Sequence, residues 1–146
     1  MKTAAMTKIL IPVDFSSTSL AALAHAEEMA HRSGAELVLF SVIEPVIAPM
    51  EFNTAAIIEA NQTDQMVARL EKLRSTEVRH GVSAVTLMAE GEPSAAIIST
   101  AAELECDLIV MGTHGHSGFR RLLLGSKTER VVRGAGCPVL TVGPGK

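Results

Sequence analysis

Aromatic residues are scarce in this chain of 146 residues, which contains no tryptophan, no tyrosine and only four phenylalanines. Proteins that bind single-stranded nucleic acid commonly stack the bases on such rings. The formal net charge of −3 also disfavours a polyanionic partner of that size. We therefore expect no nucleic-acid partner.

Long hydrophobic runs are also missing. Hydrophobic residues make up 47% of the chain, yet no uninterrupted run approaches the roughly 18 apolar residues of a membrane-spanning helix. Residues 1–8 lack the apolar core and small-residue cleavage site of a signal peptide. The two cysteines, Cys106 and Cys137, form no CxxC pair and lie beside expected strands. These features predict a cytoplasmic protein without a membrane partner, in which both thiols are reduced and buried.

Short apolar runs alternate with helical patterns along the whole chain. Strands are expected at 8–13, 35–43, 82–88, 108–111 and 139–142. Helices are expected at 16–31, 53–80, from Pro93 onward and at 127–133, with 53–80 either one long helix or two shorter ones. Nearly continuous apolar strands are typical of parallel strands that are covered on both faces. The alternation predicts a single α/β domain with an open, mostly parallel, doubly wound sheet.

A glycine-rich segment follows the expected strand at 108–111. Its glycines are Gly112, Gly115, Gly118 and Gly125, and Ser126-Lys127-Thr128-Glu129 then matches a capping box at the start of a helix. Glycines can adopt positive φ and bring backbone N–H groups close to a ligand, and helix N-termini attract anions. The segment is therefore a candidate phosphate cradle. Judged from the residues alone, a purely structural role for these glycines is equally compatible with the sequence.

Positive charge is concentrated in this same segment. Between Gly112 and Arg133 there is one acidic residue, Glu129, against five basic ones: Arg120, Arg121, Lys127, Arg130 and Arg133. Such a local excess in an acidic chain favours a small polyanionic ligand. Lys127 could contact a phosphate or extend into solvent, whereas Arg130 and Arg133 are expected on a solvated helix face.

The spacing of these glycines resembles a family pattern. Gly112-Thr113-His114-Gly115, nine further residues and Gly125-Ser126 reproduce the G-x2-G-x9-G-[S/T] pattern of the nucleotide-binding universal stress proteins. The resemblance extends from Ile9 to Val142, so a single domain is expected over 1–146. It implies a Rossmann-like five-stranded sheet with strand order 3-2-1-4-5. It also implies binding of ATP, with Mg²⁺ held through the nucleotide phosphates.

The resemblance assigns candidate binding residues by position. They are Pro12, Val13, Asp14, Val42, Met111, Gly112, His114, Gly115, Gly125, Ser126, Lys127 and Thr128. In this assignment Asp14 contacts the adenosine end or its metal, and Val42 contacts the adenine. On the residues alone, Asp14 could equally be a carboxylate that favours a helix start, and Val42 an ordinary core residue.

Catalytic signatures are missing from the sequence. A P-loop would require glycine at Ser126 and Arg121, and the H-x-G-H signature of related nucleotidyl transferases lacks its first histidine at Thr113. His114 and His116 form a pair without a third metal ligand in view. We therefore expect no catalytic residue and no protein-bound metal.

The expected function is that of an ATP-binding regulatory module of the stress response, with at most slow hydrolysis. The resemblance further implies a homodimer through antiparallel pairing of the last strand, Val139–Val142. Two alternatives stay open. One is a dimeric scaffold that acts without nucleotide, and the other is a slow ATPase whose candidate bases are Asp14, His114 and His116.

Overall fold

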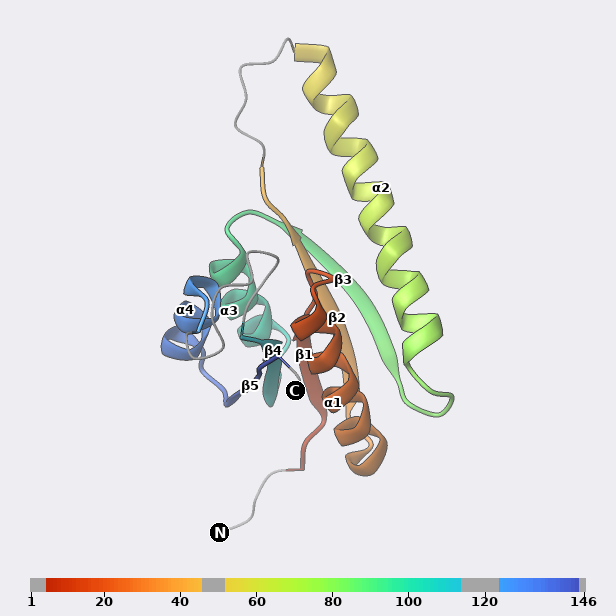
Figure 1. Ribbon diagram of the computed structural model, residues 1–146, viewed down its shortest axis with the longest axis vertical. Helices are drawn as coiled ribbons and strands as arrows, with labels where there is room; N and C mark the ends of the chain where they lie inside the picture. Colours follow the sequence, from red (N-terminus) through yellow and green to blue (C-terminus); the bar gives the residue numbers. More distant parts are fainter. Residues whose placement is uncertain (1–4, 46–51, 114–123, 145–146) are drawn as a thin grey trace.

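A computed structural model describes residues 5–45, 52–113 and 124–144, with the backbone alone for 52–60. Strands and helices alternate along these residues, as the sequence predicts (Figure 1). In chain order they are β1 (Lys8–Pro12), α1 (Ser17–Ser33), β2 (Glu36–Ile43), α2 (Phe52–Glu77), β3 (Ala84–Glu90), α3 (Pro93–Glu103), β4 (Leu108–Gly112), α4 (Ser126–Gly134) and β5 (Val139–Val142).

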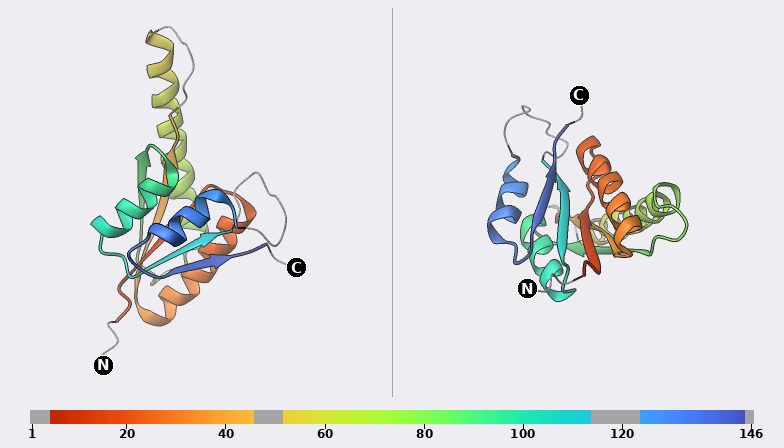
Figure 2. Two further views of the ribbon diagram at one scale, coloured as in Figure 1. Left: turned by 90° about the vertical axis from the view of Figure 1, so that its left-hand side faces the viewer. Right: turned by 90° about the horizontal axis from the view of Figure 1, so that it is seen from below.

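The five strands form one parallel sheet of order β3-β2-β1-β4-β5, which confirms the predicted fold class. Helices α1 and α2 cover one face, and α3 and α4 cover the other (Figure 2). The strand order reverses between β1 and β4, which lie side by side. Ligands of open parallel sheets bind beyond the carboxyl ends of the strands at such a reversal.

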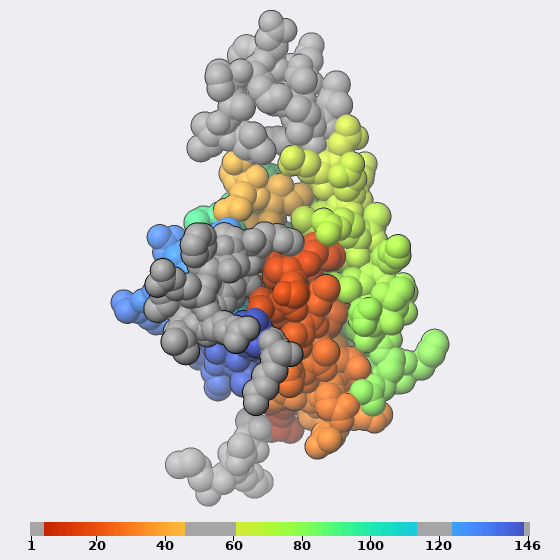
Figure 3. Space-filling view, in the orientation of Figure 1, coloured from red at the N-terminus to blue at the C-terminus, as the bar shows by residue number. Residues whose placement is uncertain are grey.

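Alternate residues of each strand enter the two layers of the core. In β1, Ile9 and Ile11 pack with α1 and α2, whereas Leu10 packs with α3 and α4, and all three are fully buried. This alternation explains why β1 has no polar face in the sequence. Figure 3 shows α1 at the surface beside α2, in the layer that encloses the first of these cores.

Local sequence signals define two of the helix starts. Ser16 caps α1 by accepting a hydrogen bond from the Ser19 N–H, and Gly34 ends the helix with a φ of 78°. Pro93 is the first residue of α3, as predicted. The cap of α3 is Glu92, and hydrogen bonds from the Ser94 hydroxyl and the Ala95 N–H hold its pKa below the usual value.

Helix α2 is one continuous helix, which answers the question that its sequence left open. It ends at Glu77 rather than at His80. Leu70 is fully buried, and Met66 and Leu73 pack beside it, at the predicted helical spacing. The first turns of α2 extend beyond the carboxyl ends of the strands (Figure 1). None of the helices in the described part of the chain is both long and apolar enough to span a membrane.

Both cysteines are free thiols in the second core layer. Cys106 is buried, and burial raises its pKa to about 11. Cys137 is only half-buried, and burial raises its pKa as well. The prediction of buried thiols is therefore right for Cys106 and only partly right for Cys137, and neither environment favours a reactive thiolate.

Candidate nucleotide site

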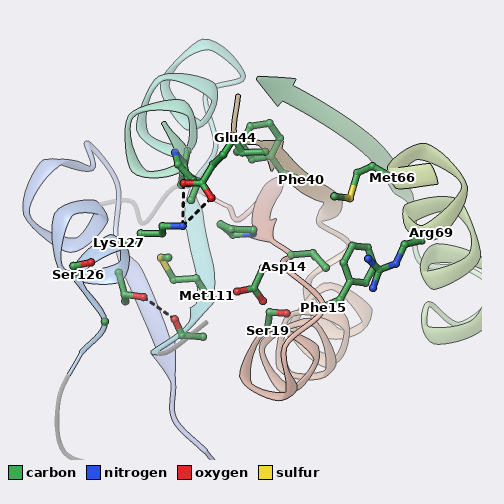
Figure 4. Close-up of a pocket in the computed structure, with 18 residues that line it drawn as sticks. Asp14, Phe15, Ser19, Phe40, Glu44, Met66, Arg69, Met111, Ser126 and Lys127 are labelled. Carbon is green, nitrogen blue, oxygen red and sulfur yellow. Dashed lines mark hydrogen bonds and ion pairs between the residues drawn. The ribbon is translucent and has the colours of Figure 1, made fainter. Parts of the chain in front are cut away.

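One cavity of about 470 Å³ lies at the carboxyl ends of β1, β2 and β4, where the strand order reverses (Figure 4). It is lined by Pro12, Val13, Asp14, Phe15, Ser19, Phe40, Val42, Glu44, Met66, Arg69, Pro93, Ile97, Met111, Gly112, Gly125, Ser126, Lys127 and Thr128. Ten of the twelve residues assigned from the sequence line this cavity. The other two, His114 and Gly115, lie outside the described residues, as do His116, Gly118, Arg120 and Arg121.

The turn after β1 provides a carboxylate at the centre of the cavity (Figure 4). Asp14 Oδ1 accepts hydrogen bonds from the Ser16 N–H, at 2.9 Å, and from the Ser16 hydroxyl. Asp14 thus orients the residue that caps α1, which is the helix-start role that its position allowed. Contact with a nucleotide remains a prediction for the same carboxylate.

The end of β2 forms a second wall. Ser41 of β2 donates a hydrogen bond from its hydroxyl to the carbonyl of Val13, the residue after β1, at 2.6 Å. Val42 is half-buried, lines the cavity and packs against the core on the α3 side. Its two possible roles, as a cavity wall and as a core residue, are therefore combined in one side chain.

Gly112 ends β4, but its φ is not positive, contrary to expectation. A Cβ there would lie 2.5 Å from Thr18 Oγ1 and 2.8 Å from the Thr18 carbonyl carbon. Glycine is required because β4 and α1 approach each other closely, a reason that needs no ligand. The sequence could not indicate this, because the neighbour lies 94 residues away.

The predicted capping box at α4 is wrong. Gly125 is the cap residue, with an ordinary φ of −61° and no side-chain hydrogen bond, and Ser126 is already the first helical residue. The Gly125 N–H donates to the Thr113 carbonyl at 2.7 Å, and the Gly125 carbonyl accepts the first bond of the helix, from the Glu129 N–H at 2.9 Å. The Glu129 carboxylate forms an ion pair with Arg133 and does not accept the capping-box bond from the Ser126 N–H.

Thr128 and Lys127 extend from the first turn of α4 in different directions. Thr128 is buried and its hydroxyl donates to the Gly112 carbonyl at 2.9 Å, which joins α4 to β4. Lys127 Nζ lies 3.3 Å from both carboxylate oxygens of Glu44 (Figure 4). Lys127 therefore extends across the cavity to the end of β2 rather than into open solvent. Both side chains of this ion pair are more than half exposed.

The far wall of the cavity comes from residues that the sequence did not nominate. Phe15 follows Asp14, and Met66 and Arg69 extend from α2 toward the cavity (Figure 4). The helical spacing around Leu70 predicts which face of α2 is buried. It does not indicate which turn of that helix lies beside the cavity, because this depends on packing between segments about 50 residues apart.

Comparisons with known proteins agree with this geometry. The model of the universal stress protein family matches residues 6–143. This chain belongs to the universal stress protein family. A curated relative, universal stress protein MJ0531 of Methanocaldococcus jannaschii, is 40% identical over 138 residues, which cover 92% of this chain and 81% of the relative.

Solved structures of universal stress proteins share the fold. Protein MJ0577 of the same organism is similar at a TM-score of 0.87 and 27% identity, covering 98% of this chain and 99% of its own. A universal stress protein solved with cAMP has a TM-score of 0.66 at 23% identity, covering 95% and 98% of the two chains. One from Archaeoglobus fulgidus solved with dAMP has a TM-score of 0.60 at 23% identity, covering 94% and 97%.

Proposed function

We propose that this universal stress protein binds an adenine nucleotide, in particular ATP with Mg²⁺, in the cavity at the carboxyl ends of β1, β2 and β4. The main support is that ten residues assigned from the sequence line one cavity at the reversal of strand order. The volume of about 470 Å³ lies within the usual range of small-ligand sites. Two remote family members solved with cAMP and dAMP add general support for the class of ligand.

In this proposal the phosphates lie at the N-terminus of α4. Free N–H groups of the first helical turn and the ammonium group of Lys127 favour negative charge there. Mg²⁺ would be bound by the phosphate oxygens, which are hard ligands that this ion prefers. The adenosine end would lie toward Asp14 and Val42, at the ends of β1 and β2. Hydrolysis, if any, would be slow, and the bound nucleotide would act as a regulatory signal in the cytoplasm.

Calorimetric titration of ATP with Mg²⁺ tests the proposal directly. We expect micromolar binding to the wild type, which corresponds to about −8 kcal/mol. Lys127→Met should weaken it severalfold, whereas Arg133→Met, an exposed cation of the same helix outside the cavity, should not. Gly125→Val should also weaken binding, and its backbone conformation accommodates valine without strain. If the wild type binds no ATP at millimolar concentration, the nucleotide-independent scaffold becomes the better account.

The proposal includes a homodimer through β5. This strand forms one edge of the sheet, and Leu140 is 40% exposed on it. The carbonyls of Pro138 and Val142 accept hydrogen bonds from the N–H groups of Ile109 and Thr113, so alternation along the strand turns the backbone groups of Thr141 outward. An edge strand of this kind can pair with a second copy. Thr141→Pro should convert a dimer to a monomer in analytical ultracentrifugation, and a monomeric wild type would contradict this part of the proposal.

A further inference from the structure

An aromatic ring and a guanidinium group are stacked on the wall of the cavity opposite α4. The Arg69 guanidinium carbon lies 3.8 Å from the centroid of the Phe15 ring. Both side chains line the cavity, and Figure 4 shows them on the far side of Asp14 from Ser126 and Lys127. The cavity therefore has a cation on each of two opposite walls, but only one of these cations stacks on a ring.

The backbone of Phe15 adopts a conformation that bulky residues rarely use. Its φ is 65°, in the left-handed region, where a Cβ is crowded by the backbone. On either side of it, the Asp14 carboxylate accepts hydrogen bonds from the Ser16 N–H and the Ser16 hydroxyl, which maintain this turn. Such unfavourable conformations are concentrated at binding and active sites, where surrounding structure maintains them. The conformation brings the ring to the cavity.

Within the described residues, Arg69 forms no ion pair with an acidic side chain, and its guanidinium group contacts the Phe15 ring. By contrast, Arg74 of the same helix pairs with Glu71 at 2.8 Å. Arg69 is exposed, so its donors remain accessible to a ligand. A guanidinium group on an aromatic ring forms a flat surface that is both apolar and cationic.

We propose that Phe15 and Arg69 form a stacking platform for the base of the bound nucleotide; this inference rests on the proposed function. A flat, electron-rich purine suits a flat cationic surface, whereas the phosphates are bound at the opposite wall, by α4. The chain has no tryptophan or tyrosine to supply such a surface. Phe40, the other ring in the cavity wall, is only 1% exposed and presents little of its face.

The test separates contact with the base from contact with the phosphates. Arg69→Met retains the apolar stem and removes the planar cation, and Arg74→Met is the matched control on the same helix. Each variant is titrated with ATP, adenosine and tripolyphosphate, and thermal melting verifies that it is folded. For Arg69→Met we expect ATP and adenosine to bind about tenfold more weakly, as for the loss of one stacking contact. Tripolyphosphate binding should be unchanged, and Arg74→Met should behave as wild type.

The reverse pattern is expected for Lys127→Met. This variant should bind ATP and tripolyphosphate more weakly than wild type but bind adenosine with unchanged affinity. As a second readout, the Phe15 ring-proton resonances should shift when ATP is added, and Phe15→Leu identifies them among the four phenylalanines. If ATP binds Arg69→Met as tightly as wild type, or the ring resonances do not move, the platform is disproved while the nucleotide site stands. Equal losses for ATP and tripolyphosphate would make Arg69 a phosphate ligand and also overturn the inference. If the wild type binds no nucleotide, the proposed function itself fails.

Discussion

The two ends of the sheet use their aspartates differently. At the amino end, Asp107 Oδ2 accepts hydrogen bonds from the Thr7 N–H, the Thr7 hydroxyl and the Lys8 N–H at 2.7 to 2.9 Å, and so joins β4 to the start of β1. At the carboxyl end, Asp14 Oδ1 accepts hydrogen bonds from Ser16, two residues away in its own turn. The amino end links strands to one another, whereas the carboxyl end shapes a cavity.

The two ends also differ in the charged groups around the cavity. The exposed Lys127–Glu44 ion pair and the Arg69 guanidinium over the Phe15 ring both lie in the cavity wall. At the amino end, Cys106, next to Asp107, is instead buried, and burial raises the pKa of its thiol to about 11. The comparison indicates that Asp107 at the amino end serves stability alone, whereas residues at the carboxyl end, such as Gly112, both pack the fold and line the cavity. Substitutions at the two ends should separate these effects.

The largest effect is expected for Gly112→Ala, which adds a Cβ 2.8 Å from a backbone carbon of Thr18. Overpacking of this kind costs about 1 to 3 kcal/mol, and we expect the upper part of that range because backbone cannot move aside easily. Gly136→Ala is the control, since a Cβ there meets no atom within 4 Å. Urea unfolding measures both. Equal stability of the two variants would show that the carboxyl end of β4 is not tightly packed against α1.

Next comes Asp107→Ala, which removes three hydrogen bonds from the amino end and should cost about 1 to 2 kcal/mol at neutral pH. Asp64→Ala, on the exposed surface of α2, is the control. Hydrogen bonds from the Thr7 and Lys8 N–H groups and the Thr7 hydroxyl lower the pKa of Asp107 below its usual 3.8. ATP affinity should not change, because Asp107 does not line the cavity.

The lowered pKa of Asp107 also predicts a pH dependence. The folded state favours the ionised carboxylate, so its stabilising contribution is complete above the unfolded pKa and disappears as the pH falls through the folded pKa. The stability difference between wild type and Asp107→Ala should therefore shrink as the pH is lowered below about 4. A difference that stays constant from pH 7 to pH 3 would contradict this account of the amino end.

The smallest effect is expected for Glu44→Gln, which frees Lys127 from its ion pair across the cavity. Exposed ion pairs contribute at most about 1 kcal/mol, so ATP affinity should rise by no more than about fivefold. Stability should hardly change. The control is Glu129→Gln, which removes the ion pair between Glu129 and Arg133 within α4. A lower ATP affinity for Glu44→Gln would mean that Glu44 supports the ligand instead of competing for Lys127.

Sequence patterns of short range determined most of the fold. Nearly continuous apolar runs such as 35–43 indicate parallel strands covered on both faces. Ser16 marks a helix start through its side-chain oxygen, and Pro93 does so through its fixed backbone conformation. The family resemblance supplied the strand order and assigned ten residues that line the cavity. Each of these signals depends on a few neighbouring residues or on a fixed glycine spacing, and it can therefore be recognised in a single sequence.

Tertiary structure alone decided the details of the site. Gly112 is required by Thr18, Lys127 pairs with Glu44, and Arg69 stacks on Phe15, and each pair joins residues more than 50 positions apart. Likewise, Gly125, which is bonded to Thr113, caps α4 where the local pattern predicted a capping box that begins at Ser126. Such contacts depend on how the helices pack against the sheet. That packing is determined by the whole core rather than by any one segment.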